Sequence, residues 1–272
     1  MVKLNYRQIL LGSFSWQRLI LAPIFIYGCF ALYIFFKADS MIFLPQSPSY
    51  RDTDEVIKLP VTNQEEISAL YFPNPDATFT LLYIHGNAED LGDIRPRLEQ
   101  LQQSGLSVFA YDYRGYGTSD GHPSESNAYE DAKQAYAYLT KELGVKPNRL
   151  LVKGRSLGGG SAVYLATQYP VAGVILESTF TSIFRVVVPI PILPFDKFTS
   201  LDRLKQVKAP VLVMHGENDQ VIPIEQGRRL FEAASGPKRS LWVAEAGHNN
   251  FSQVAGERYF QTLKEFQRLV LE

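Results

Sequence analysis

The residues of this chain whose types and spacing are most typical of catalysis form a G-x-S-x-G stretch at 154–158. This stretch follows the apolar run 150–152 and precedes residues 161–166, whose composition is typical of a helix. A sharp turn from strand to helix needs glycine on both sides of its central residue, because side chains there would collide across the turn. Such a turn exposes the hydroxyl of Ser156 and predicts that Ser156 is a nucleophile. Ordinary glycine- and serine-rich loops share this spacing, so a base and a carboxylate must also be found.

The base is expected to be a histidine, because a serine hydroxyl is a weak nucleophile until its proton is removed. Two histidines follow Ser156, namely His215 and His248. Where the nucleophile stands on a strand–turn–helix, the order along the chain is serine, then acid, then histidine. His215 precedes the acid candidate, whereas His248 follows the last predicted strand in a Gly-His-Asn turn. The order favours His248, whose alternative interpretation is a histidine of an ordinary surface loop.

The acid is expected to be Asp219, which lies in a loop after the predicted strand 211–215. The Val-Ile-Pro sequence at 221–223 can fix this loop. An aspartate that only stabilises a turn or caps a helix would fit the same sequence pattern. Glu217 and Glu177 are the alternative candidates for the acid.

The negative charge that develops on a tetrahedral intermediate needs N–H donors that are already in place. One donor is expected to be the amide of Leu157, directly after the nucleophile, and the other the amide of Asn87. Gly86 allows the loop after the predicted strand 80–85 to turn tightly and point that amide into the site. We expect three further polar side chains to form a supporting network without a chemical role: Glu89, Asp112 and Arg114.

Short apolar runs typical of strands recur along the chain and alternate with helix-like stretches. The runs lie at 67–72, 80–85, 107–113, 150–153, 172–176, 211–215 and 241–243. This alternation predicts an α/β fold with a mostly parallel sheet flanked by helices. Ligands of such sheets bind beyond the carboxyl ends of the strands. Ser156, Asp219 and His248 each follow a predicted strand, so the fold is expected to bring them together.

The composition argues against several other classes of protein. The net charge of −1 and the lack of a basic stripe argue against a nucleic-acid partner. The single cysteine, Cys29, excludes an intramolecular disulfide and a cysteine-based zinc site. The four histidines form no H-E-x-x-H motif, so we expect no catalytic metal.

Residues 19–36 carry no charge and approach the length of about 20 residues that crosses a bilayer. Lys3, Arg7 and Arg18 precede this run, which predicts a cytoplasmic N-terminus and an exported remainder. We prefer a membrane anchor to a buried core helix because the run is apolar on every face. Four parts are therefore expected: a short cytoplasmic N-terminus at 1–18, a transmembrane signal anchor at 19–36, a linker at 37–55 and an α/β domain at 56–272.

A cleaved signal is the alternative to this anchor. Residues 26–29 loosely resemble a lipobox, which would place cleavage and lipidation at Cys29. The apolar run continues through Phe36, whereas a cleaved signal has a shorter apolar core that ends in small or polar residues. The sequence therefore favours an uncleaved anchor.

The segment 180–204 is strongly apolar in its first part, and its three prolines prevent one long helix. One interpretation is a helix and a buried connection that pack on the sheet. The other is an apolar rim beside the site that accepts an acyl chain or touches the bilayer.

Five stretches together resemble the membrane-anchored α/β-hydrolase domain-containing proteins, a group that includes protein depalmitoylases. They are HGNA at 85–88, YDYRGYGTS at 111–119, GRSLGG at 154–159, HGEND at 215–219 and GHN at 247–249. The resemblance covers most of the chain from about residue 56. It implies the α/β-hydrolase fold, a Ser-Asp-His triad, no cofactor, and hydrolysis of esters, thioesters or sometimes amides. Epoxide hydrolases and dehalogenases of this fold use an aspartate nucleophile, so Ser156 argues against them.

We therefore predict a membrane-anchored serine hydrolase that cleaves carboxylic esters or thioesters of a small-molecule or lipid-like acyl substrate. Within enzymes, the alternative is an aminopeptidase-like serine peptidase of the same fold. Outside enzymes, it is a non-catalytic membrane scaffold.

Overall fold

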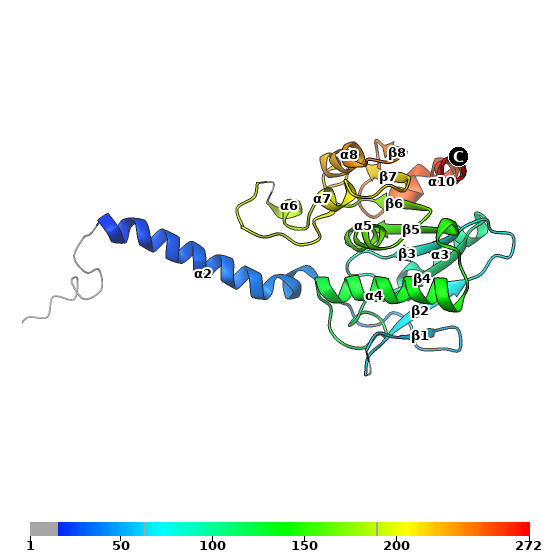
Figure 1. The fold of residues 1–272 in the computed structure, drawn as a ribbon, viewed down its shortest axis with the longest axis horizontal. Coiled ribbons are helices and arrows are strands. Elements are labelled where there is room, and N and C mark those ends of the chain that lie inside the picture. Colours follow the sequence, from blue (N-terminus) through cyan, green and yellow to red (C-terminus); the bar gives the residue numbers. More distant parts are fainter. Residues whose placement is uncertain (1–15, 63, 189) are drawn as a thin grey trace, which may run out of the picture. The chain divides into compact units, whose positions relative to one another are not determined.

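The computed structural model of the chain describes residues 16–62, 64–188 and 190–272 (Figure 1). The chain divides into two compact units, of which the first ends at Met41 and the second begins at Ile42. In its described part the first unit is a single helix. The second unit contains the sheet and every residue of the candidate site.

Helix α2 (Trp16–Ile42) has 27 residues and contains Pro23. Its stretch Leu19–Ile42 has a mean hydropathy of 2.3 and is long and apolar enough to cross a membrane. At about 1.5 Å per residue, these 24 residues extend over roughly 36 Å, more than the hydrocarbon thickness of about 30 Å. By length and composition, the helix fits a membrane anchor and equally a signal sequence. Most of the N-terminus predicted for 1–18 lies outside the described residues.

The second unit is built on one eight-stranded sheet with the order β1-β2-β4-β3-β5-β6-β7-β8. The strands are β1 (Ile57–Pro60), β2 (Glu66–Phe72), β3 (Thr80–Ile84), β4 (Ser107–Tyr111), β5 (Leu150–Arg155), β6 (Gly173–Glu177), β7 (Val211–Gly216) and β8 (Lys238–Val243). The β1–β2 and β2–β4 pairs are antiparallel, and all other pairs are parallel. The predicted mostly parallel sheet is therefore confirmed. The sequence analysis missed β1, a four-residue edge strand that ends in proline.

Helices cover both faces of the sheet. They are α3 (Leu91–Gln103), α4 (Glu125–Ala137), α5 (Gly158–Gln168), α7 (Ser200–Leu204), α8 (Ile224–Ala233), α9 (Phe251–Ala255) and α10 (Glu257–Leu271). A further short helix, α6 (Phe184–Val187), has no buried residue. A π-helical turn (Tyr138–Glu142) extends α4, and a 3₁₀ turn (Pro147–Arg149) precedes β5.

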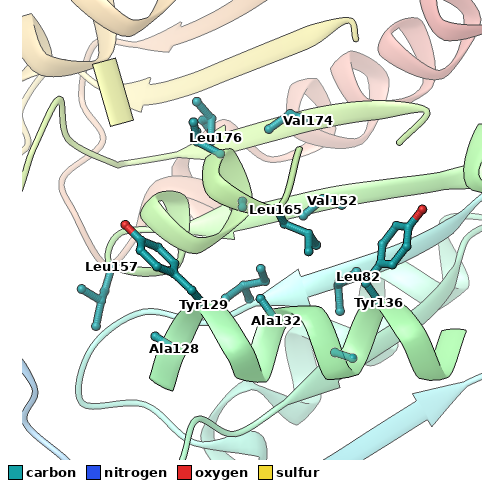
Figure 2. Packing of buried hydrophobic residues seen from close by; sticks show 14 of the residues in the cluster. Leu82, Ala128, Tyr129, Ala132, Tyr136, Val152, Leu157, Leu165, Val174 and Leu176 are labelled. Atoms are coloured by element: carbon teal, nitrogen blue, oxygen red, sulfur yellow. The ribbon is translucent and has the colours of Figure 1, made fainter. Parts of the chain in front are cut away.

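The core has two halves, because successive side chains of a strand point to opposite faces of the sheet. Leu82 of β3 belongs to the half covered by α4, α5, α7 and α8, whereas Leu81 belongs to the half covered by α3, α9 and α10. Figure 2 shows part of the first half, with Val152 and Val174 on neighbouring strands and Ala132 on α4. Small alanines on that helix allow it to approach the sheet closely.

The residues predicted as a linker, 37–55, take up two kinds of structure. Those up to Ile42 continue α2, and those after it follow the surface of the second unit. Phe43 is buried among aromatic rings that include Tyr113 and Tyr116. Tyr50 donates a hydrogen bond to Asp112 at 2.6 Å. The chain is thus fixed to the second unit from the first residues after α2.

Candidate active site

Ser156 stands at a tight turn between β5 and α5, and its backbone has a positive φ of 50°. This left-handed conformation is uncommon for a residue other than glycine. The flanking glycines make it possible: a Cβ on Gly154 would lie 2.4 Å from the carbonyl oxygen of Gly158. A Cβ on Gly158 would lie 2.2 Å from the carbonyl oxygen of Ile84. The Ser156 amide donates to the Glu177 carbonyl at 2.9 Å, which holds the turn against β6.

The structure brings Ser156, His248 and Asp219 together in one chain of polar contacts. The Nε2 atom of His248 lies 3.1 Å from the Oγ atom of Ser156. The Nδ1 atom of His248 lies 2.8 Å from the Oδ2 atom of Asp219. When neutral His248 carries its proton on Nδ1, this N–H donates a hydrogen bond to the Asp219 carboxylate. The Nε2 atom is then free to accept the proton of the serine hydroxyl. The geometry is therefore that of a nucleophile, a base and an orienting acid.

Asp219 is fixed in its loop by its own backbone surroundings. Its Oδ1 atom accepts hydrogen bonds from the amides of Val221 at 2.9 Å and Ile222 at 2.8 Å. Burial raises the pKa of Asp219, but the hydrogen bonds from His215, His248 and the Ile222 amide outweigh it and hold the pKa well below its usual range. The carboxylate is therefore ionised at neutral pH and can orient a protonated Nδ1.

The competing candidates lie elsewhere. The Glu217 carboxylate is an exposed partner of Arg228 at 3.2 Å. The Glu177 carboxylate binds the buried amine of Lys153 at 2.6 Å. His215 is fully buried, with its Nε2 atom 2.8 Å from the carbonyl oxygen of Ile222 and 3.3 Å from the Asp219 carboxylate. His215 thus helps to hold Asp219, a role that the sequence analysis did not predict.

Asn87 and Leu157 both line the pocket that contains Ser156 and His248. Within the described part of the chain, neither amide donates a hydrogen bond, so both are available to an incoming oxyanion. The Asn87 side chain is firmly held, because its Nδ2 atom donates to the Ile42 carbonyl at 2.6 Å and its Oδ1 atom accepts from the Tyr116 hydroxyl at 2.6 Å. Ile42, the last residue of α2, and Tyr116 therefore support the loop that carries the Asn87 amide.

Arg155 joins two sides of the site and was missed by the sequence analysis. Its Nη1 atom lies 2.8 Å from the Glu89 carboxylate, which also accepts the Gly86 amide at 2.9 Å. Its Nη2 atom donates to the His248 carbonyl at 3.0 Å and to the Asn249 side chain at 2.8 Å. Burial raises the pKa of Glu89, but the cations of Arg155 and Arg97 outweigh it and lower the pKa overall. Arg155 thereby ties the Asn87 loop to the His248 loop.

The predicted network of Glu89, Asp112 and Arg114 is divided in the structure. Glu89 belongs to the site through Arg155, whereas Arg114 pairs with the buried Asp131 at 2.7 Å. The Asp112 carboxylate accepts from Tyr50 and from the Leu91 amide at 2.9 Å. Only Glu89 of the three touches the pocket.

A buried ionic cluster lies behind the turn. The fully buried Lys153 of β5 bonds to the Glu177 carboxylate and contacts the hydroxyl of Tyr259. Burial raises the pKa of Glu177, but the cations of Lys153, Arg97 and Arg155 outweigh it and lower the pKa to about 2. The cluster joins β5, β6 and α10, and β5 leads directly into Ser156.

The pocket has a volume of about 610 Å³ and a largely apolar wall. Its apolar lining comprises Leu44, Leu157, Phe180, Ile183, Val186, Val221 and Ile222. Phe180, Ile183 and Val186 belong to the segment 180–204, so part of that segment forms the pocket wall. Within the described ranges, no group of three or more histidine, cysteine, aspartate or glutamate side chains is placed to hold a metal ion.

Comparisons with known proteins agree with this fold. A family model described as serine aminopeptidase, S33, matches residues 75–200. Alpha/beta hydrolase domain-containing protein 17B of Xenopus tropicalis is 40% identical over 196 residues, which are 71% of this chain and 67% of the relative. The human protein of the same name is 39% identical over the same length. Pyrococcus furiosus esterase Pf2001 aligns with a TM-score of 0.69 at 21% identity, over 82% of this chain and 98% of the esterase.

The chain therefore belongs to the family of α/β-hydrolase domain-containing proteins, and its second unit has the α/β-hydrolase fold. We call this second unit, residues 42–272, the hydrolase unit.

Proposed function

We propose that the chain is a serine hydrolase that cleaves ester or thioester bonds through an acyl-enzyme intermediate. The observation that carries this proposal is the continuous contact from Asp219 through His248 to Ser156 at the wall of an apolar pocket. Asn87 and Leu157 line the same pocket, and among the described residues neither amide donates a hydrogen bond, which also supports it. Family membership supports hydrolysis in general.

In the proposed reaction, the Oγ atom of Ser156 attacks the carbonyl carbon of the substrate while His248 takes the hydroxyl proton. The amides of Asn87 and Leu157 hold the oxygen that becomes negative. When the intermediate collapses, His248 gives its proton to the leaving alcohol or thiol, and the acyl group stays on Ser156. A water molecule then attacks the acyl-enzyme with His248 again as the base, which releases the acid and restores the serine.

The apolar pocket wall supports an acyl substrate with a hydrocarbon chain. Each buried methylene contributes about 0.8 kcal/mol at most, so a few of them change kcat/KM by tenfold or more. The test is a series of p-nitrophenyl esters from acetyl to dodecanoyl, with Ser156→Ala as the inactive control. We expect kcat/KM to rise with chain length, and a preference for acetyl without gain at longer chains would contradict the acyl pocket.

A peptidase is the second candidate, favoured by the description of the matching family model. A substrate with a free amine needs a carboxylate at the pocket, and Asp93 lines it at an exposed position. The other carboxylate there, Glu89, is already paired with Arg155. Aminoacyl p-nitroanilides distinguish the two candidates. Hydrolysis of these amides at rates above those of esters, abolished by Asp93→Asn, would favour the peptidase.

We also propose that α2 is an uncleaved membrane anchor, with the N-terminus in the cytoplasm and the hydrolase unit on the exported side. The uncharged run 19–36 of the candidate span and the basic residues Lys3, Arg7 and Arg18 support this topology. Carbonate extraction, N-terminal sequencing and protease protection test it. A soluble product, a product that begins at Cys29, or a hydrolase unit protected from protease on the exported side would contradict it.

A further inference from the structure

Five of the eight large apolar side chains exposed among the described residues of the hydrolase unit belong to the pocket or to one loop beside it. Among the unit's described residues, eight large apolar side chains are exposed: Leu44, Tyr169, Val187, Ile190, Ile192, Val221, Val254 and Leu271. Leu44 and Val221 line the pocket of Ser156. Val187, Ile190 and Ile192 belong to the described residues 183–188 and 190–195, which we call the α6 loop. Val187 is the most exposed of all, at 82%. Such a concentration of apolar side chains marks a surface that contacts another apolar phase.

The α6 loop is held at its base by a polar clamp. The Arg185 guanidinium lies 3.3 Å from the Asp196 carboxylate. The same carboxylate accepts hydrogen bonds from the Ser182 hydroxyl at 2.7 Å and the Phe184 amide at 3.2 Å. The clamp joins the two ends of the loop, so the apolar residues between them form its tip.

Several backbone groups of the tip have hydrogen-bond partners within the loop. The Val188 amide donates to the Phe184 carbonyl at 2.8 Å, and the Val188 carbonyl accepts from Arg185 at 3.0 Å. The Ile190 carbonyl accepts from Arg185 and from the Ile192 amide. Transfer of a backbone group into lipid without a hydrogen-bond partner costs several kcal/mol of free energy. The carbonyls of Val188 and Ile190 have their hydrogen-bond partners inside the loop. The one cation of the loop is neutralised by Asp196.

The same helical turn faces both the tip and the pocket. Val186 and Ile183 line the pocket of Ser156, whereas the next residue, Val187, is exposed at the tip. A hydrocarbon chain can therefore pass from the tip to the pocket along adjacent apolar side chains.

The candidate membrane span and the pocket are close to each other along the chain. The candidate span ends at Ile42, whose carbonyl accepts from the Asn87 side chain at 2.6 Å. Leu44, only two residues further, lines the pocket, and its amide donates to Asn87 Oδ1 at 3.0 Å. Two residues of extended chain reach at most about 7 Å. Leu44 of the pocket therefore stands within this short reach of the chain end of the candidate span.

We propose that the α6 loop lies in the lipid interface of the membrane that α2 crosses and passes acyl chains from the bilayer to the pocket. The occupant of this surface is a bilayer, because Leu44 of the pocket beside it follows the candidate membrane span by only two residues. The proposal rests on the anchor and the acyl substrate proposed above. It adds a second membrane contact and a route for the substrate.

The contact is tested on the full chain with Cys29→Ser, reconstituted in vesicles of phosphatidylcholine and phosphatidylglycerol. A single cysteine, Val187→Cys or Ile190→Cys, carries the fluorophore NBD, and Leu271→Cys is the matched control because it is also exposed. We expect a blue-shifted emission that is quenched by lipids with a nitroxide near the top of the acyl chain, at 187 and 190 and not at 271. Absence of quenching at 187 and 190 overturns the proposal. A blue shift of the NBD emission that depends on protein concentration and is not quenched by the nitroxide lipids also overturns the proposal. It would indicate that a second copy of the chain covers the loop.

The route is tested by the double variant Val187→Asp, Ile190→Asp, whose changed side chains do not line the pocket. We expect turnover of a vesicle-embedded long-chain 4-methylumbelliferyl ester to fall by at least about tenfold, with turnover of soluble p-nitrophenyl acetate unchanged. Leu271→Asp should change neither. Equal loss on both substrates, or no loss on the embedded one, overturns the route. Failure of the proposed hydrolase function gives a different result, because the unaltered protein would then hydrolyse neither ester while the quenching measurement still reports the membrane contact.

Discussion

The guanidinium of Arg155 donates a hydrogen bond to the carbonyl oxygen of His248 at 3.0 Å, although the two residues are 93 positions apart. Arg155 directly precedes the candidate nucleophile and is almost completely buried. It also holds Glu89, which in turn accepts the amide of Gly86 in the loop of Asn87. One side chain thus sets the spacing between the proposed base and one proposed oxyanion donor.

Replacement of Arg155 is expected to impair turnover more than substrate binding. In Arg155→Ala, the loops of Asn87 and His248 lose their common partner, and misplacement of reacting groups by about 1 Å can cost about a hundredfold in rate. We expect kcat for a short p-nitrophenyl ester to fall by roughly ten- to a hundredfold, with little change in KM. Arg155→Lys should recover part of the loss, because a single ammonium pairs with Glu89 but does not reach all three partners. Arg228→Ala, at an exposed ion pair, is the control, and an unimpaired Arg155→Ala would refute the bridging role.

The choice of Asp219 as the acid is tested against its neighbour Glu217. In Asp219→Asn, the side chain no longer fixes the tautomer of His248, and we expect kcat to fall by about 10⁴. Glu217→Gln changes only an exposed ion pair and should stay within about twofold. Because the pKa of Asp219 is depressed, its carboxylate is already ionised at pH 4 and above. We therefore expect no change of rate in that pH range from the titration of Asp219. A large loss in Glu217→Gln with activity retained in Asp219→Asn would reverse the assignment.

The turn at Ser156 depends on glycine at position 158. A Cβ there would lie 2.2 Å from the backbone oxygen of Ile84 and 2.7 Å from that of His85, and neither can yield without movement of β3 and its loop. We expect Gly158→Ala to lower the free energy of unfolding by about 1–3 kcal/mol and to abolish most activity. Gly247→Ala is the matched control, since its nearest neighbours are 3.6 Å away, and should stay within about 0.5 kcal/mol. Denaturant unfolding of both variants measures the difference, and equal stabilities would contradict the steric account.

The buried Glu177 predicts how stability depends on acid. Its pKa falls from 4.5 to about 2 on folding, so its ionised form stabilises the fold above about pH 4.5 and this contribution is lost as the pH falls toward 2. We expect Glu177→Gln to be less stable than the unaltered protein at pH 7, because Lys153 loses its buried partner. The difference in unfolding midpoint between Glu177→Gln and the unaltered protein should become smaller as the pH is lowered from 5 to 3. The exposed Glu142→Gln should follow the unaltered protein throughout, and a gap that stays constant with pH would count against the ionic role of Glu177.

The sequence predicted the features of this chain that depend on local patterns. The G-x-S-x-G turn needs glycines because of contacts within a few residues, and the apolar strands need both faces covered. The order of Ser156, Asp219 and His248 after successive strands was sufficient to predict their meeting, because parallel strands place their carboxyl ends together. The α/β-hydrolase fold was predicted for the same reason.

The features that the sequence did not predict depend on contacts between distant segments. Nothing near Arg155 in the chain indicates that its side chain reaches Glu89 and His248. Lys153 interrupts an apolar strand, and its burial becomes clear only when Glu177 and Tyr259 are placed beside it. Residues 43–55 are polar enough to suggest a free linker, yet Tyr50 and Ser49 bond to aspartates of the hydrolase unit.

Covalent labelling by a fluorophosphonate is the most direct test of the central claim that Ser156 is a nucleophile activated by His248. The full chain is labelled, its fold is verified by a cooperative thermal transition, and the modified peptide is located by mass spectrometry. We predict an adduct on Ser156, none in Ser156→Ala, and labelling slowed by at least about a hundredfold in His248→Ala. A folded protein whose Ser156 does not label would contradict the account, and so would labelling that is independent of His248.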